Sequence, residues 1–93
     1  MEFDKNPDFF EEKVEILKAL AHPVRLCIVK GLIGKGKCNV SYMQECLNIP
    51  QSTISQHIGK LKAVGIIKGN RNGLEINYYV ANEDAKKVIN ALF

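Results

Sequence analysis

The chain carries the stretch Gln51-Ser-Thr-Ile-Ser-Gln-His-Ile-Gly-Lys-Leu-Lys62, and this stretch decides its fold. Apolar side chains recur at i, i+4 and i+7 in Ile54, Ile58 and Leu61, and this spacing predicts a helix with one apolar stripe. The other side carries small polar and amide residues, where a merely solvated face usually carries Glu and Lys: Ser52, Ser55, Gln56, Gly59, Lys60 and Ala63. Such a face can approach DNA base edges in a major groove and hydrogen-bond to them. An ordinary polar surface helix is the alternative.

A shorter helix is expected just before this one. Asn39 or Ser41 would cap it, and its inward side chains would be Val40, Met43 and Leu47. The two helices are separated by Asn48-Ile49-Pro50, in which asparagine tolerates the left-handed backbone region. Two short helices joined by three or four residues, the second with a polar outward face, are typical of a helix-turn-helix.

A β-hairpin is expected after the helix, which should end at Gly65. Residues 66–69 form a short strand, and the turn Asn70-Arg71-Asn72-Gly73 contains Asn-Gly, a strong hairpin signal. The returning strand alternates apolar and polar residues, and its inward side consists of Leu74, Ile76, Tyr78 and Val80. Such a hairpin is a wing, and Arg71 at its tip would reach a minor groove or phosphates. The alternative for Arg71 is an ordinary solvated turn residue.

Amphipathic helices flank these elements. The first begins at Asn6-Pro7-Asp8, and one row of its wide apolar face is Phe10, Val14, Leu17 and Ala21. We expect part of this face to pack on the domain and part to bind a second copy; the alternative is that all of it is core.

His22-Pro23 ends the first helix and begins another, which should end at Gly34. Asn82 caps the last helix, whose apolar face is Ala85, Val88, Ile89 and Leu92. The fold class is therefore mainly α with a two-stranded wing, in the order α-α-α-α-β-β-α, and the terminal helices suit dimerisation.

The composition fits one soluble domain spanning residues 1–93. Hydrophobic residues make up 46% and charged residues 25%, and no apolar run approaches the about 20 residues of a membrane span. The acidic N-terminus lacks the apolar core of a signal peptide, which predicts a cytoplasmic protein with no membrane partner. Three cysteines without a Cys-x-x-Cys motif argue against a disulfide framework.

The net charge of +3 is unevenly distributed. Residues 1–15 hold six acids and two lysines, whereas residues 51–74 hold no acid and four basic side chains, namely Lys60, Lys62, Lys68 and Arg71. This basic segment suits a phosphate backbone, with chance clustering as the alternative.

Four segments resemble the ArsR/SmtB family of winged-helix repressors. They are LKALAHPVRL at 17–26, LNIPQSTISQHI at 47–58, LKAVGII at 61–67 and INYYV at 76–80. The resemblance covers roughly residues 14–92 in order, without large gaps. It implies a homodimeric repressor that binds a pseudo-palindromic operator in double-stranded DNA and leaves it when an inducer arrives.

The resemblance also implies roles for single residues. The base-contacting positions of the family fall on Gln51, Ser52, Ser55 and Gln56, with Thr53 and His57 as weaker candidates. His57 lies at the border of the apolar stripe, so we interpret it as a packing or phosphate-contacting residue. His22 lies at a helix junction and is interpreted as a structural cap.

The inducer sites of the family are not reproduced. Its Cys-x-Cys metal motif would fall on Asn39-Val40-Ser41, and the last helix has no His and only two acids, in its first turn, so neither metal site and no cofactor is predicted. Related thiol sensors use a cysteine of the last helix, which has none here. Cys27, Cys38 and Cys46 are expected to be buried structural thiols; the alternative is a thiol switch or soft-metal site formed by two of them.

Two other functions compete with DNA binding. A winged helix that binds protein instead of DNA would lack the basic, small-polar face. An enzyme would pair Cys38 or Cys46 with His57, but there is no glycine-rich phosphate cradle and no pair of acids, so a non-enzyme is expected.

Overall fold

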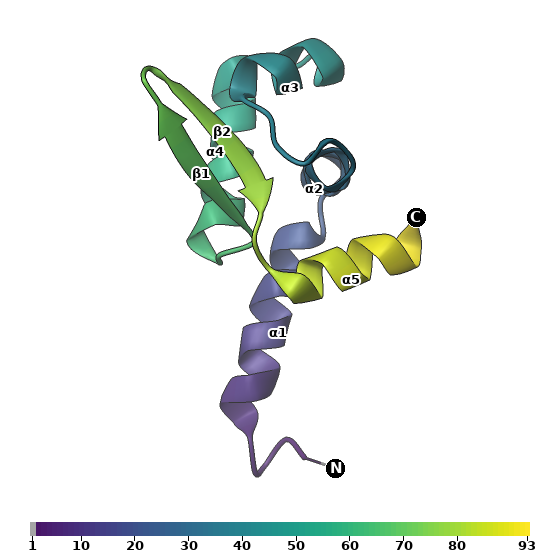
Figure 1. The fold of residues 1–93 in the computed structure, drawn as a ribbon. Coiled ribbons are helices and arrows are strands. Elements are labelled where there is room, and N and C mark those ends of the chain that lie inside the picture. Colours follow the sequence, from purple (N-terminus) through teal and green to yellow (C-terminus); the bar gives the residue numbers. More distant parts are fainter. Residues whose placement is uncertain (1) are drawn as a thin grey trace.

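The computed structural model describes residues 2–93. Five helices and two strands follow in the order α1 (Pro7–Leu20), α2 (Pro23–Lys35), α3 (Val40–Leu47), α4 (Gln51–Ala63), β1 (Ile67–Asn72), β2 (Glu75–Val80) and α5 (Glu83–Leu92). Figure 1 shows α2, α3, α4 and the hairpin gathered into a head, from which α1 projects as a stalk that α5 crosses near its C-terminal end. The predicted winged helix-turn-helix order is confirmed.

Most helix ends lie where the sequence placed them, because local capping groups fix them. The Nδ1 atom of His22 accepts a hydrogen bond from the Val24 N–H at 3.1 Å, at the start of α2. Asn39 and Asn82 accept from backbone N–H groups at 2.8 Å and cap α3 and α5. Asn48 ends α3 in the left-handed region, at φ 55° and ψ 45°. These contacts satisfy donors that a helix start leaves unpaired.

The predicted end of α2 at Gly34 is wrong. The helix continues through Gly34 to Lys35 and ends at Gly36, which has φ 94°. A glycine inside a helix is tolerated at a small cost, whereas a positive φ at the helix end strongly favours glycine.

The predicted turn of the hairpin is also displaced. Asn72 pairs with Glu75 at the end of the ladder, so the two-residue loop consists of Gly73 and Leu74. Gly73 supplies the positive φ of 67°, while Asn72 stays in the strand. Leu74 was predicted to point inward, but it occupies the wing tip with its side chain fully exposed.

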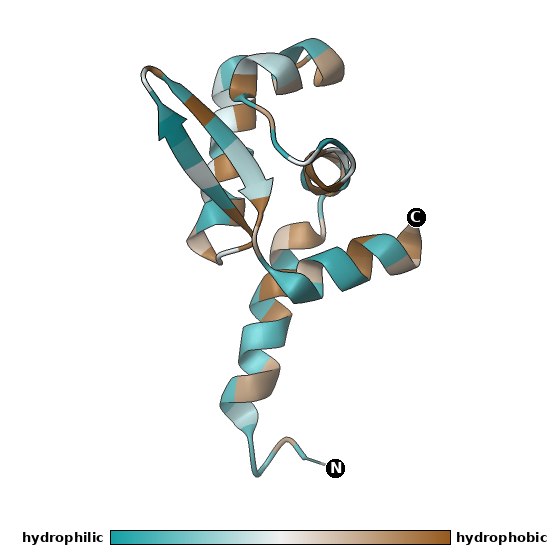
Figure 2. Ribbon diagram, in the orientation of Figure 1, coloured by the Kyte–Doolittle hydropathy of each residue, from teal (hydrophilic) through white to brown (hydrophobic). Residues whose placement is uncertain are grey.

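The core lies where the head meets the C-terminal end of α1. Ile54, Ile58 and Leu61 are buried, which confirms the apolar stripe of α4, and Ile16 and Leu20 of α1 are buried with them. Figure 2 shows further apolar residues on the projecting part of α1 and at the C-terminal end of α5. Because Phe10, Val14 and Leu17 of that face are exposed, the alternative that the whole apolar face of α1 is core is wrong.

The segment before α3 is tied to the wing. Cys38 forms an antiparallel bridge with Tyr78 of β2, in which the Cys38 N–H donates at 3.1 Å and the Cys38 carbonyl accepts at 2.8 Å. The wing is thus connected to the segment before α3 through this bridge, as well as to the end of α4 through the chain. Among residues 2–93, no helix is long and apolar enough to cross a membrane.

Candidate nucleic-acid interface

The outward side of α4 carries the residues that the sequence singled out. Gln51, Ser52, Ser55 and Gln56 are all exposed, while the stripe on the other side of the helix is sealed in the core. Burying one side of α4 fixes the direction of the opposite one, so the four polar side chains share one solvent-facing surface. Their short amides and hydroxyls donate and accept hydrogen bonds, as base edges do.

Thr53 and His57 are half-buried and belong to the flank of this surface. The His57 ring lies with its centroid 4.5 Å from that of His22. Its Nδ1 atom lies 3.2 Å from an Nη of Arg25. A guanidinium only donates, so Nδ1 accepts and the neutral ring carries its proton on Nε2. His57 thus has the packing environment expected for the border of the stripe.

The surroundings of His57 disfavour its charged form. Burial lowers the pKa of His57 below its ordinary value, and the nearby His22, Arg25 and Lys60 lower it further. Arg25 is itself buried, and its Nε donates to the Ala19 carbonyl at 2.6 Å. Arg25 of α2 therefore connects His57 of α4 with the Ala19 carbonyl of α1 through hydrogen bonds.

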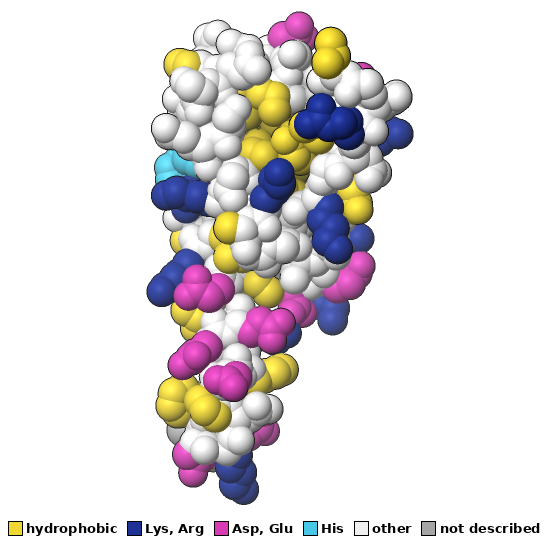
Figure 3. All heavy atoms as spheres, turned by 90° about the vertical axis from the view of Figure 1, so that its left-hand side faces the viewer, with side chains coloured by type: hydrophobic (Ala, Val, Ile, Leu, Met, Phe, Trp, Pro, Cys, Tyr) yellow, Lys and Arg dark blue, Asp and Glu magenta, His cyan; other side chains and the backbone are white. Residues whose placement is uncertain are grey.

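The four basic residues of the interface are exposed on α4 and β1. Lys60 and Lys62 lie in the last turn of α4, and Lys68 and Arg71 lie on β1. Arg71 was placed at the wing tip, but the structure places it within the strand, paired with Ile76. In Figure 3, basic side chains are spread over the visible face of the head, and acidic side chains gather along the stalk.

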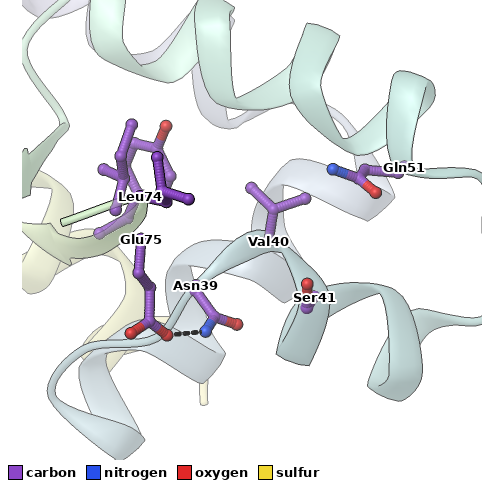
Figure 4. Close-up of a pocket in the computed structure, with 8 residues that line it drawn as sticks. Asn39, Val40, Ser41, Gln51, Leu74 and Glu75 are labelled. Carbon is purple, nitrogen blue, oxygen red and sulfur yellow. Dashed lines mark hydrogen bonds between the residues drawn. The ribbon is translucent and has the colours of Figure 1, made fainter. Parts of the chain in front are cut away.

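A groove of about 430 Å³ lies between α3, the start of α4 and the wing. Figure 4 shows Asn39, Val40 and Ser41 on one side of this groove, Gln51 at the start of α4, and Leu74 and Glu75 on the wing. The Asn39 side-chain amide donates to the Glu75 carboxylate while its oxygen caps α3. The wing is therefore held to the first helix of the helix-turn-helix by side chains as well as by backbone.

Sequence reasoning missed three residues of this region. Arg25 forms a hydrogen bond with His57 of α4, and Glu75 of the wing accepts one from Asn39. Leu74 is exposed at the wing tip. An arginine among the apolar residues that open α2 is a signal that could have indicated a buried contact. Nothing in the sequence around Leu74 or Glu75 indicates their partners or their exposure.

The cysteines do not all match their prediction. Cys38 is buried, as expected for a structural thiol, but Cys27 and Cys46 are exposed. The local apolar pattern suggests burial of both, yet both thiols remain accessible to solvent. Within residues 2–93, no group of three or more His, Cys, Asp and Glu side chains is arranged to hold a metal ion.

Comparisons with known proteins agree with this geometry. A helix-turn-helix domain family matches residues 20–70. The transcriptional repressor PagR of Bacillus anthracis is 42% identical over 82 residues, which cover 88% of this chain and 82% of PagR. The repressor SmtB of Mycobacterium tuberculosis is 39% identical over 81% of this chain and 55% of its own length.

Solved structures extend the similarity to the whole arrangement. The crystal structure of PagR has a TM-score of 0.84 at 40% identity and covers 90% of this chain and 95% of its own. A homodimeric winged helix-turn-helix DNA-binding domain from Mycobacterium bovis has a TM-score of 0.82 at 25% identity, covering 96% of this chain and 82% of that one. The chain therefore belongs to the ArsR/SmtB family of winged helix-turn-helix transcriptional repressors.

Proposed function

We propose that two copies of this chain bind a pseudo-palindromic operator in double-stranded DNA, with α4 of each copy in a major groove. The observation that carries this proposal is the exposed small-polar side of α4, flanked by basic residues. A two-fold protein dimer presents two identical reading helices, and such dimers match half-sites about 34–36 Å apart. A repressor acting in this way works in the cytoplasm, where its DNA is.

Base contacts and phosphate contacts are assigned to different residues of this surface. Gln51, Ser52, Ser55 and Gln56 contact bases, while Thr53 and His57 support the helix from its flank. The phosphate backbone is bound by Lys60, Lys62, Lys68 and Arg71. Phosphate contacts supply affinity in a salt-dependent way, whereas base contacts supply specificity.

The dimer is proposed to form through α1 and α5. Six large apolar side chains on these elements are between 37% and 67% exposed, namely Phe9, Phe10, Val14, Leu17, Leu92 and Phe93. Lys13 of α1 pairs with Asp84 of α5 and holds the pKa of that carboxyl below its ordinary value. The pair joins the two helices, and exposed apolar surface of this extent marks an interaction site.

The first test is fluorescence anisotropy with the duplex upstream of the protein's own gene and a scrambled duplex of equal length. The expected Kd is about 10 nM or tighter for the operator, and at least about 1,000-fold weaker for the scrambled duplex. Eight phosphate contacts in the dimer predict a slope of log K against log salt of about −7. Absence of any preference for the operator at every salt concentration would contradict base reading.

Two matched variants separate the roles. Gln56→Ala should reduce discrimination between the duplexes by about 1–3 kcal/mol per half-site and leave the salt slope unchanged. Lys60→Ala should weaken binding to both duplexes and make the slope less steep by about two for the dimer. If Gln56→Ala changes the slope and keeps discrimination, the assignment of Gln56 is wrong.

Leu17→Glu tests the dimer surface. This side chain is 51% exposed, so the variant should fold and elute as a monomer in light-scattering chromatography, with weaker operator binding. Lys18→Glu, on the same turn of α1 but outside the apolar row, is the control and should stay dimeric. A dimeric Leu17→Glu variant would place the interface elsewhere.

A further inference from the structure

All three cysteines of the chain line one apolar cavity between α2 and α3. The cavity has a volume of about 170 Å³. Cys27 comes from α2, Cys38 from the segment before α3, and Cys46 from the last turn of α3. Sequence positions that share no motif thus converge on a single space, which the DNA-binding surface does not use.

Two polar side chains of the cavity lie beside its thiols. Tyr42 and Cys46 lie one helical turn apart on α3, and the proximity of Cys46 raises the pKa of the Tyr42 hydroxyl. The phenol therefore keeps its proton. The Lys35 ammonium lies 4.4 Å from the centroid of the Tyr42 ring. Tyr42 and Lys35 thus place a phenol and a positive charge on the lining that the three thiols share.

The three thiols differ in their suitability as nucleophiles. Burial raises the pKa of Cys38 and keeps it protonated, although Lys35 opposes this. Cys27 also faces a second groove, between α2 and α5, where neither Tyr42 nor Lys35 contributes to the lining. Cys46 alone combines exposure, an adjacent phenol and an opening to the apolar cavity.

We propose that this cavity binds a small apolar α,β-unsaturated carbonyl compound and that Cys46 adds to it, releasing the repressor from DNA. The inference rests on the proposed function and supplies its inducer. The volume is close to that of an engineered cavity of about 150 Å³ that binds benzene, so a six-membered ring fits. Met43 and Leu32 provide apolar walls for such a ring.

The addition balances without an oxidant or a leaving group. The Cys46 sulfur forms a bond to the β-carbon while the carbon–carbon π bond breaks and its electron pair moves to the carbonyl oxygen as an enolate. The Lys35 ammonium stabilises this oxygen. The proton lost by the thiol then returns to the α-carbon, and the product is a saturated ketone bound through a thioether.

The cavity is connected to the wing by backbone hydrogen bonds. Cys38 lines the cavity and pairs through both of its backbone groups with Tyr78 of β2. The next residue, Asn39, caps α3 and donates to Glu75 of the wing. An adduct that displaces Cys38 or the start of α3 must therefore shift the wing relative to α4, because packed interiors do not absorb such a change locally.

The test uses 2-cyclohexenone as the probe and cyclohexanone, which has the same ring but no double bond, as the matched control. Mass spectrometry of the intact protein and its peptides should show one 2-cyclohexenone adduct, on Cys46. It should form at least about tenfold faster than on Cys46 in the urea-unfolded chain, because the cavity holds the ring beside the thiol. The adduct should weaken operator binding by about 5–150-fold, the usual range of coupling between sites, while cyclohexanone has no effect.

Three variants locate the effect. Cys46→Ser should bind the operator normally and resist release by 2-cyclohexenone. Tyr42→Phe should form the adduct more slowly with unchanged operator affinity. Cys27→Ser should behave like the parent protein, since it keeps the nucleophile and its neighbours.

The results separate this inference from the proposed function. The adduct is measured without DNA, so a protein that fails to bind any operator still reports whether Cys46 is selectively reactive. Equal, slow modification of Cys27 and Cys46 would overturn the site. A complete Cys46 adduct that leaves operator affinity unchanged would overturn its role as an inducer site.

Discussion

An Nη of Arg25 lies 3.2 Å from Nδ1 of His57 and joins the start of α2 to the reading helix. The same guanidinium donates to the Ala19 carbonyl at 2.6 Å, so one buried side chain connects α1, α2 and α4.

Arg25→Met should destabilise the fold by about 1–3 kcal/mol, since it leaves the Ala19 carbonyl and the His57 ring without their donor. Urea unfolding followed by circular dichroism measures the change. Lys37→Met, at an exposed position, is the control and should stay within about 0.5 kcal/mol of the parent protein. Equal effects of the two substitutions would mean that the Arg25 contacts do not contribute.

Acidification should destabilise the fold through His57. Its pKa is lowered in the folded state, above all by burial, so the unfolded chain binds more protons and stability falls as the pH drops below 6.5, the ordinary histidine pKa. In urea unfolding, the His57→Gln variant should lose less unfolding free energy than the parent protein when the pH is lowered from 7 to below 6.5. A histidine titration by NMR that places His57 above 6.5 would contradict the structure.

The apolar stripe of α4 can be tested at Ile54, whose side chain is completely buried. Ile54→Ala should cost about 2–5 kcal/mol of unfolding free energy and Ile54→Val only about 0.5–1.5 kcal/mol, because the cavity left behind differs in size. Ser55→Ala, on the neighbouring exposed position, should be nearly neutral in the same measurement. A small effect of Ile54→Ala would show that the core around α4 collapses readily.

Two glycines offer opposite outcomes for the same substitution. A Cβ at Gly69 of β1 would lie 2.8 Å from Cγ2 of Ile76 and 3.1 Å from Cε1 of Tyr78, so Gly69→Ala should destabilise by about 1–3 kcal/mol. A Cβ at Gly59 of α4 meets nothing within 4 Å, and Gly59→Ala should stabilise by about 0.5–1 kcal/mol. Thermal unfolding of both variants checks the contrast, and a stabilised Gly69→Ala would show that the wing side chains move aside freely.

The helix ends were predictable because their signals act within one turn. The asparagines at 39, 48 and 82 and the His22-Pro23 pair each fix the backbone through contacts with near neighbours. The exposed polar face of α4 was predictable for a related reason, since helix periodicity alone assigns its buried and exposed sides.

The remaining features depend on contacts between distant segments. Gly34 and Gly36 look equally able to end α2, and the helix ends at Gly36, two residues before the bridge between Cys38 and Tyr78. The strand register removes Leu74 from the core and places it at the tip. The cavity of the three cysteines forms where α2, α3 and the segment before α3 come together, which no local pattern encodes.

The separation of acidic stalk and basic head makes each chain an electric dipole along its long axis (Figure 3). Residues 2–15 hold six acids and two lysines, while the four cations of the interface lie on α4 and β1 in the head. A duplex therefore attracts one end of the molecule and repels the other during diffusion, which turns the protein before contact. Added salt shortens the range of this torque to about 8 Å at physiological ionic strength, so it should slow association more than it alters the geometry of the final complex.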